Sequence, residues 1–140
     1  MVLLQPYHLF HDNSDTVCTY AINFTIEQDT LHMTVMMRSN DVIYGFTNDA
    51  FCFSQIYKFV HAYLKASYPT LKRGKYTHFT NSMHVYEHHY TMIQDIIAHG
   101  WHGWSPIQVP AVTWADVDDI VSSKGQEAHC DYYTWLKTES

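Results

Sequence analysis

The sequence predicts a single mixed α/β domain of the α+β type, with helices packed on a mixed β-sheet. Two β-rich runs, residues 17–26 and 31–37, precede a segment with helical apolar spacing, residues 48–67, after which strand-like and helical patterns alternate. The chain has 140 residues, of which 46% are hydrophobic. That length supports one apolar core but not two, so we expect one domain over residues 1–140.

The first expected element is a β-hairpin. Val, Cys, Thr, Tyr, Ile and Phe dominate residues 17–26, and residues 31–37 alternate in a similar manner. β-Branched and aromatic side chains of this kind favour strands. The polar tripeptide Glu27-Gln28-Asp29 separates the two runs, so the pattern predicts two strands joined by a turn.

The second expected element is a buried helix over residues 48–67. Apolar side chains recur there at helical spacing, at Cys52, Ile56, Phe59, Val60, Tyr63 and Leu64. Thr47 or Asn48 is available as the N-terminal cap, and Pro69 stands just beyond the end.

A basic cluster comes next. Lys72, Arg73 and Lys75 surround Gly74, and we interpret them as a solvated turn rather than as a phosphate-binding loop. Residues 75–79 then predict a strand.

The last third predicts three further elements. Residues 91–99 indicate a short helix that Gly100 ends. Residues 107–113 predict a strand, and residues 114–123 predict a helix with an acidic exposed face.

Composition excludes several function classes. The net charge is −6 and no Lys or Arg precedes Arg38, so we expect no nucleic-acid partner. No stretch approaches the ~18 apolar residues of a membrane span, and the N-terminus lacks the features of a signal peptide. Cys18, Cys52 and Cys130 are far apart and never form C-x-x-C. This pattern argues against a zinc ribbon or a disulfide scaffold and favours a cytoplasmic protein.

A candidate site surrounds the end of the second predicted strand. Arg38, Ser39 and Asp41 stand where that strand gives way to a loop, and Cys18 lies twenty residues upstream. An arginine with an adjacent hydroxyl suits a phosphate monoester, and a thiol adds readily to an electron-poor ring carbon. Together these residues indicate a nucleotide site.

Three histidines close together raise the alternative of a metal centre. His84, His88 and His89 have ligand-like spacing, but no motif such as H-E-x-x-H accompanies them. We therefore expect no metal.

Three features of the chain match the motifs of a known family. They are the run Met37-Arg38-Ser39-Asn40-Asp41-Val42-Ile43-Tyr44-Gly45, the separation between Cys18 and Arg38, and the segment His84-x-Tyr86-x-x-His89. Together they resemble the thymidylate synthase superfamily. That superfamily includes the phage-type deoxycytidylate hydroxymethylases. The resemblance spans residues 16–97 and is fairly specific, because three motifs occur in the family's order. It implies a thymidylate synthase-like fold.

The resemblance also implies a role for each matching residue. Cys18 would attack C6 of a pyrimidine, and Arg38 with Ser39 would bind the 5′-phosphate of a pyrimidine deoxynucleoside monophosphate. His84 and Tyr86 would hold the deoxyribose 3′-hydroxyl. Without the resemblance, Cys18 would be interpreted as a buried structural cysteine.

Two acidic residues complete the implied site. Asp41 matches an aspartate that contacts the base and folate, and Asp49 occupies the position that distinguishes cytosine from uracil. A carboxyl group at that position favours deoxycytidylate over deoxyuridylate. A one-residue shift would instead place Asn48 there and reverse the preference. Asp49 is alternatively only an acid favoured by the N-terminal helix dipole.

Departures from the family leave two function classes open. The chain is about half the family's usual length, so the expected glutamate for proton transfer and the paired arginines from a partner subunit are missing. One class is a pyrimidine C5 methyl- or hydroxymethyltransferase that uses 5,10-methylenetetrahydrofolate, either alone or as one part of a larger complex. The other is a non-catalytic nucleotide-binding or regulatory relative. In either case we expect a homodimer or hetero-oligomer.

Overall fold

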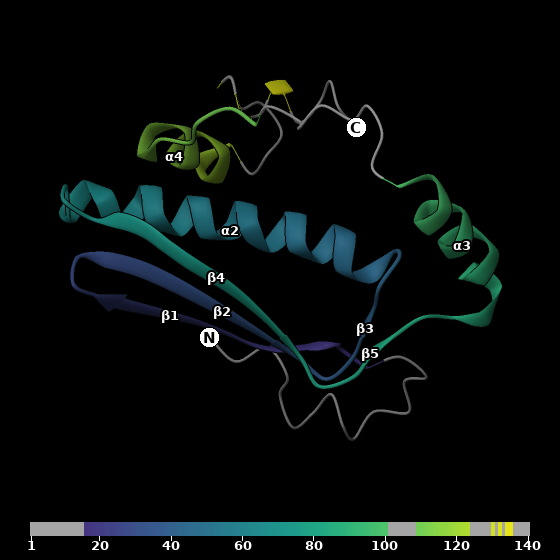
Figure 1. Cartoon of the computed structure of the whole chain (residues 1–140). Helices are drawn as coiled ribbons and strands as arrows, with labels where there is room; N and C mark the ends of the chain where they lie inside the picture. Colours follow the sequence, from purple (N-terminus) through teal and green to yellow (C-terminus); the bar gives the residue numbers. More distant parts are fainter. Residues whose placement is uncertain (1–15, 101–108, 124–129, 131, 133, 136–140) are drawn as a thin grey trace.

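The computed structural model describes residues 16–100, 109–123, 130, 132, 134 and 135. Figure 1 shows three layers: a β-sheet, the long helix α2 (Gly45–Ser67) across one face of it, and helix α4 (Trp114–Ser122) on the other side of α2. The predicted α+β class is therefore confirmed. Within these residues, no helix has the length and apolar character that a membrane span requires.

The predicted hairpin is present. Strand β1 (Thr19–Glu27) pairs antiparallel with β2 (Thr30–Met37), and Glu27 lies opposite Thr30. The two turn residues, Gln28 and Asp29, have positive φ values of 48° and 58°. This is the backbone that a two-residue hairpin loop adopts so that its twist matches the strands.

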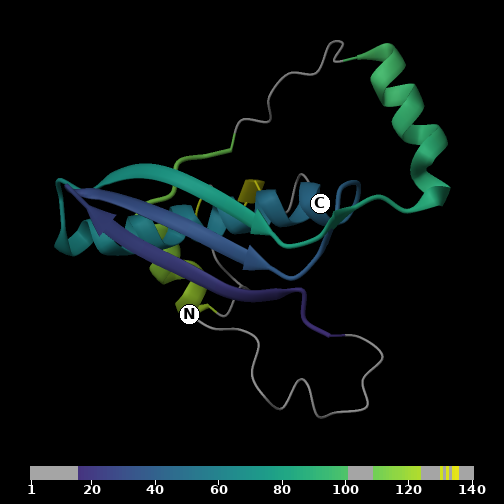
Figure 2. The ribbon, with the colours of Figure 1, turned by 60° about the horizontal axis from the view of Figure 1, so that its bottom comes forward.

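Strand β4 (Lys72–Thr80) adds to the other edge of β2 in the parallel direction, which gives the order β1-β2-β4 (Figure 2). The interpretation of residues 72–75 as a turn is therefore wrong, because they begin this strand. A β-bulge accompanies them, since the register shifts where Leu31 and Met33 face Arg73 and Tyr76. A Cβ at Gly74 would lie 2.5 Å from the His32 ring, so only glycine fits there without a shift.

A second, two-stranded sheet continues from the ends of β2 and β4. Strand β3 (Asn40–Asp41) pairs in parallel with β5 (Met83–His84). The 3-10 helix η1 (Glu87–His89) then leads into α3 (Tyr90–His99), which Gly100 ends with φ 63°. The predicted helix over residues 91–99 is confirmed, and Figures 1 and 2 both place it beyond the start of α2, away from the three-stranded sheet.

The core lies between β2 and α2. Every second residue of β2 is buried, and the fully covered side chains are Leu31, Met33, Val35 and Met37. Ile22 from β1, Phe53 and Tyr57 from α2, and Leu71 complete the same apolar cluster. The strict alternation arises because β2 is the central strand and one of its faces is covered by the helix.

Helix α2 has two apolar faces, whereas the sequence pattern predicted a single buried one. Phe53 and Tyr57 are buried against the sheet, and Val60 and Leu64 pack beside them. Among the positions predicted to be buried, Cys52, Ile56 and Tyr63 are exposed. These three positions and Phe59 follow the adjacent stripe, on which Tyr63 contacts Trp114 and Phe59 contacts Tyr132.

The predicted caps of α2 are also wrong. The helix begins at Gly45, and its N-cap residue Tyr44 has no side-chain cap. Thr47 Oγ1 and Asn48 Nδ2 instead donate to the carbonyls of Ile43 and Tyr44, at 2.6 and 2.7 Å. These side chains therefore bond to backbone carbonyls in the first turn and do not cap the helix. The N–H groups of Tyr44 and Gly45 are instead capped by the carboxylate of Asp41 in β3.

The predicted C-terminal helix is confirmed as α4. Thr113 and Asp116 form a capping box, in which the Thr113 Oγ1 accepts from the Asp116 N–H at 3.3 Å. The predicted strand over residues 107–113 is wrong where the structure describes it, because residues 109–113 form no ladder. Pro110 lacks an N–H, which disfavours strand pairing. Residues 107 and 108 lie outside the described part.

One buried hydroxyl joins α2 to the central strand β2 and to the edge strand β4. Tyr57 Oη donates to the carbonyl of Leu31 and accepts from the N–H of Gly74 at 2.8 Å. The bulge in β4 leaves the Gly74 N–H free for this bond. Tyr57 is 7% exposed, so water cannot easily replace the hydroxyl.

We predict that Tyr57→Phe lowers the free energy of unfolding by about 1–3 kcal/mol, because two buried backbone groups lose their partner. Urea denaturation followed by circular dichroism measures the change. The matched control is Tyr63→Phe, whose ring is 56% exposed, and we expect a change within about 0.5 kcal/mol there. Equal losses in both variants would contradict the role assigned to the Tyr57 hydroxyl.

Candidate functional site

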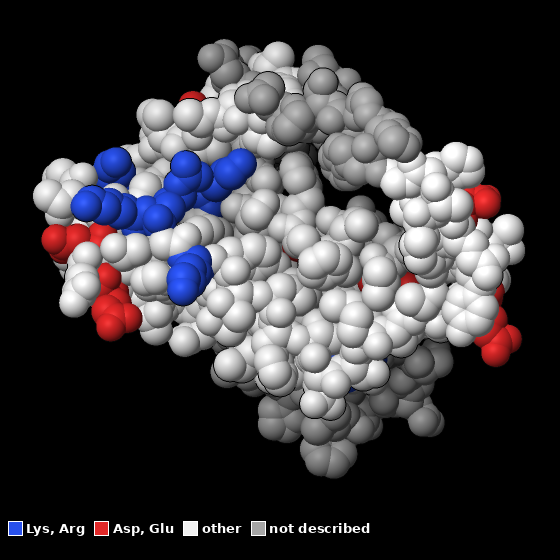
Figure 3. Space-filling view, in the orientation of Figure 1, with Lys and Arg blue, Asp and Glu red and all other residues white. Residues whose placement is uncertain are grey.

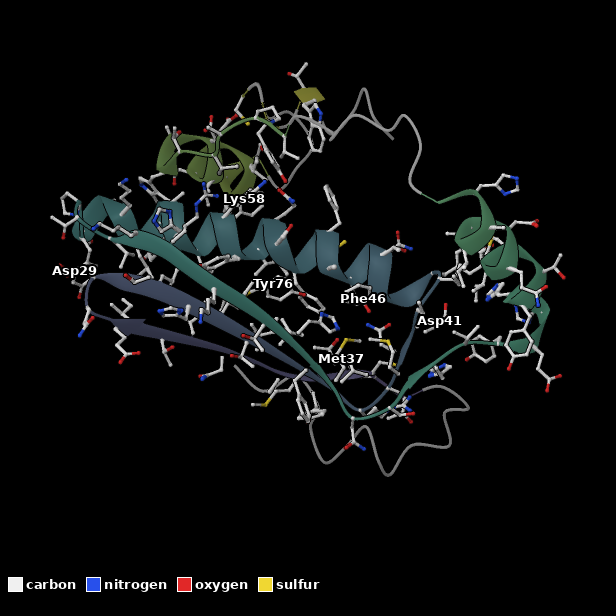
Figure 4. All side chains as sticks on the ribbon, viewed as in Figure 1. Asp29, Met37, Asp41, Phe46, Lys58 and Tyr76 are labelled. Atoms are coloured by element: carbon white, nitrogen blue, oxygen red, sulfur yellow. The ribbon has the colours of Figure 1, made fainter. Side chains whose placement is uncertain are left out.

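A cleft of about 480 Å³ opens where β1 begins, β2 ends and α2 starts. All seven side chains that the sequence singled out line it: Cys18, Arg38, Ser39, Asp41, Asp49, His84 and Tyr86. They come from six separate elements and loops, and the hairpin, the β3–β5 pair and the first turns of α2 bring them together. In Figure 4, Met37 and Asp41 mark the end of the sheet that forms this cleft.

The hairpin register explains how Cys18 meets Arg38. Thr19 lies opposite Met37, and the N–H of Arg38 donates to the carbonyl of Cys18 at 2.9 Å. The twenty-residue separation thus becomes a direct cross-strand contact. Cys18 is half-buried and its thiol is free, so it is accessible from the cleft.

The guanidinium of Arg38 is held by the loop that precedes Cys18. Its Nη2 donates to the carbonyl of Thr16 at 2.6 Å and its Nε to that of Val17 at 3.3 Å. A guanidinium has five N–H donors, so donors remain for an anion in the cleft. Ser39 Oγ lies 3.5 Å from Nη1. This geometry fixes the guanidinium at the cleft and leaves it able to bind a phosphate.

Asp41 supplies the cap of α2. Its carboxylate accepts from the N–H groups of Tyr44 at 2.8 Å and of Ile43 and Gly45, both at 3.3 Å. The bond from Tyr44 holds the pKa of Asp41 below its ordinary value of 3.8, and the bonds from Ile43 and Gly45 act in the same direction. Asp41 thereby fixes the orientation of the helix start that carries Asp49.

Asp49 and Asn48 occupy different places, although they are adjacent in sequence. Asp49 lines the cleft, whereas Asn48 is exposed and its amide is bonded to the Tyr44 carbonyl. The helical rotation of about 100° per residue separates the two side chains. Of the two candidates for contact with a base, only Asp49 therefore faces the cleft.

His84 and Tyr86 line the cleft beside Asp41. His84 pairs with Asp41 in the β3–β5 ladder, and its carbonyl accepts from the N–H of Val42 at 3.0 Å. The rings of His84 and Tyr86 meet edge to face with centroids 5.0 Å apart. Tyr86 is 51% exposed, so its hydroxyl is accessible to a ligand. Among the described residues, no three His, Cys, Asp or Glu side chains are grouped to hold a metal.

The sequence analysis missed a polar network under the cleft. Asn40 is buried, and its Nδ2 lies 3.1 Å from His78 Nε2, while His78 Nδ1 lies 2.6 Å from the Tyr76 hydroxyl. Because an amide nitrogen only donates, Nε2 accepts and Nδ1 carries the proton. Figure 4 shows Tyr76 between β4 and α2. The sequence signal that could have identified this network was Asn40, an amide that follows the end of β2 and lies directly between Ser39 and Asp41.

Burial sets the charge state of this network. It lowers the pKa of His78, although the negative charge of Asp49 opposes this effect. It raises the pKa of Tyr76 to about 12, and Asp49 adds to the shift. Both groups are therefore neutral near pH 7.

The family model described as "Thymidylate synthase" matches residues 5–133. The chain is 31% identical over 107 residues to a deoxycytidylate 5-hydroxymethyltransferase of Enterobacteria phage T6, covering 72% of this chain and 42% of the relative. It is 30% identical, with the same coverage, to the protein of that name from phage T4. A thymidylate synthase of Colwellia psychrerythraea is 27% identical over 133 residues, covering 86% of this chain and 44% of the relative. The chain thus spans less than half the length of these relatives.

Proposed function

Since this chain belongs to the thymidylate synthase family, we propose that its cleft binds a pyrimidine deoxynucleoside monophosphate and serves a C5 methyl- or hydroxymethyltransferase. The observation that carries the proposal is that the seven side chains selected from sequence motifs line a single cleft. A volume of about 480 Å³ lies in the usual range for small-molecule sites.

In this proposal, different polar groups of the cleft bind the phosphate, the sugar and the base of the nucleotide. The donors of Arg38 that are not engaged by Thr16 and Val17 bind the 5′-phosphate together with the Ser39 hydroxyl. His84 and Tyr86, which line the same cleft, bind the 3′-hydroxyl of the sugar. The base then lies between Cys18 and Asp49.

Cys18 acts as the nucleophile in this arrangement. Its thiol loses a proton, the sulfur forms a bond to C6, and the electrons of the C5–C6 double bond move to C5. C5 then forms a bond to a proton or a one-carbon unit. Loss of the original C5 proton supplies the electron pair that re-forms the C5–C6 double bond as the thiolate leaves C6.

Asp49 gives the site its preference for deoxycytidylate over deoxyuridylate. Cytosine presents an N3 acceptor and an N4 donor, which a carboxyl group can satisfy by sharing a proton with N3. Uracil presents an N3–H donor and an O4 acceptor, which suit an amide. The exposed position of Asn48 supports Asp49 as the residue that contacts the base.

The one-carbon donor in this proposal is 5,10-methylenetetrahydrofolate. The polar residues of the cleft match the nucleotide, whereas its apolar lining is limited to a few side chains such as Val17, Met37 and Tyr86. A folate ring system needs a larger apolar surface. We therefore propose that a homodimer or hetero-oligomer completes the folate side, in a cytoplasmic setting that keeps the free thiols reduced.

A non-catalytic nucleotide-binding or regulatory role is the second candidate. The observation that favours it is the engagement of Asp41 by three backbone N–H groups. A carboxylate used in this way has less capacity to contact a base and folate. Both candidate functions include nucleotide binding, and a measurement of catalytic turnover distinguishes between them.

We predict that Arg38→Ala weakens deoxycytidylate binding by about 1.5–3 kcal/mol, the scale of a charge-assisted hydrogen bond. Titration calorimetry measures the affinity. Lys72→Ala removes the same charge from an exposed site outside the cleft and should leave the affinity unchanged. Absence of binding to the wild-type chain, or equal affinity in the Arg38 variant, would reject the phosphate site.

We predict that Asp49→Asn shifts the ratio of affinities from deoxycytidylate toward deoxyuridylate, because the amide donates to O4 and accepts from N3–H. Competition titrations with both nucleotides give the ratio. Asn48→Ala is the control, since that amide lies outside the cleft. A ratio that changes in the Asn48 variant and not in the Asp49 variant would reverse the assignment.

We predict that the isolated chain releases tritium slowly from C5-labelled deoxycytidylate and that methylenetetrahydrofolate yields little product. Groups that act as a unit in catalysis fail together when some are missing. Cys18→Ser should abolish the exchange, while Cys52→Ser, which changes an exposed thiol, should not. Product formation at about 1 per second or faster would show a complete enzyme, and exchange that survives Cys18→Ser would exclude the nucleophile.

A further inference from the structure

A second cavity, of about 530 Å³, lies beside the C-terminal half of α2. We call it the basic cavity. Its cationic or ionisable lining residues are Lys58, His61 and Lys65 from α2 and Arg73 from β4. Residues 109–114 form the opposite wall, and none of the lining residues is an Asp or Glu. The cavity therefore concentrates positive charge without a carboxylate in its walls.

The distribution of charge over the chain strengthens this observation. The net charge is −6, yet five of the eight Lys and Arg residues belong to the second half of α2 and the start of β4: Lys58, Lys65, Lys72, Arg73 and Lys75. Figure 3 shows Lys and Arg side chains gathered on this side of the molecule. An acidic protein that gathers its cations on one surface produces a local field that attracts anions.

Lys58 lines the basic cavity and is anchored by a hydrogen bond to the buried Gln55 side chain. Its Nζ donates to Gln55 Oε1 at 3.2 Å, and the same oxygen accepts from the Tyr132 hydroxyl at 3.0 Å. Figure 4 shows Lys58 on the side of α2 that faces α4. Burial lowers the pKa of Lys58, and the charge of Arg73 lowers it further. The two cations therefore repel each other in the free protein, and an anion between them would relieve that repulsion.

The distance between the cationic side chains of the cavity indicates which type of anion can contact all of them. Lys58 and Lys65 are seven residues apart on one helix, which corresponds to about 10 Å along its axis. A chain of several phosphates can contact both lysines and Arg73 together, whereas a single phosphate is best placed for one or two of them. The opposite wall is apolar, through residues 109–112, and ends in Trp114, whose ring packs on Tyr63 with centroids 4.7 Å apart. A flat aromatic base can rest against this wall.

We propose that the basic cavity binds a nucleoside triphosphate, with the triphosphate on Lys58, Lys65 and Arg73 and the base against Trp114. The site is separate from the cleft at the start of α2. Asp49 and His61 are twelve residues apart, or about 18 Å along the helix. The proposal is therefore independent of the function assigned to the cleft.

The experiment is a calorimetric titration of the full chain with ATP and with inorganic triphosphate, at fixed ionic strength. We expect both to bind, and Lys58→Gln and Arg73→Gln each to weaken binding at least about tenfold, the scale of one charge-assisted hydrogen bond. Trp114→Leu should weaken the binding of ATP and leave that of triphosphate unchanged. Lys72→Gln is the matched control, because it removes one charge beside Arg73 outside the cavity. Thermal unfolding of each variant verifies that it is folded.

Four outcomes would overturn the proposal. They are the absence of triphosphate binding to the wild-type chain, an equal loss in Lys72→Gln, displacement of ATP by deoxycytidylate, and loss of ATP binding in Arg38→Ala. The last two would place the ATP in the cleft. A single-stranded oligonucleotide that binds through Lys58 and Arg73 when triphosphate does not would instead identify a nucleic-acid surface.

Discussion

The position of α2 across the sheet is the constraint on which the rest of the structure depends. The apolar faces of β2 and α2 cover each other, and the buried Tyr57 hydroxyl bonds to the backbone of β2 and β4 at once. A hydrophobic contact alone is not directional and permits sliding, whereas these hydrogen bonds fix the helix along its axis. The start of α2 is thereby fixed against the end of β2, where the cleft forms.

The cleft is organised before any ligand is present. Asp41 orients the first turn of α2, and Arg38 is held by the carbonyls of residues 16 and 17. Because these charged groups already have partners, little conformational entropy remains to be lost on binding of the proposed nucleotide. The Asn40–His78–Tyr76 network supports the same region from below. His78 and Tyr76 are neutral near pH 7, so this network adds no charge to the region of Asp49.

The two ends of α2 differ in chemistry. Its N-terminal part faces a cleft that combines Cys18, one arginine and carboxylates, while its C-terminal part faces a cavity lined by three Lys or Arg residues and no carboxylate. One rigid helix therefore connects a site of mixed charge to a strongly cationic one. Both hollows are therefore built on one continuous helix, with Asp49 near its start and Lys58 and Lys65 in its second half.

The sequence by itself determined the local elements: the hairpin, the alternation of β2, helices α2 to α4, and the family motifs that selected the cleft residues. These features depend on periodicity and on short spacings, which neighbouring residues encode. Only the tertiary structure decided that residues 72–75 form a parallel strand, which stripe of α2 faces the sheet, and that Asp41 caps the helix. It also decided that Asp49, and not Asn48, faces the cleft. Each of these depends on a partner distant in sequence, and a local pattern does not specify the partner against which it packs.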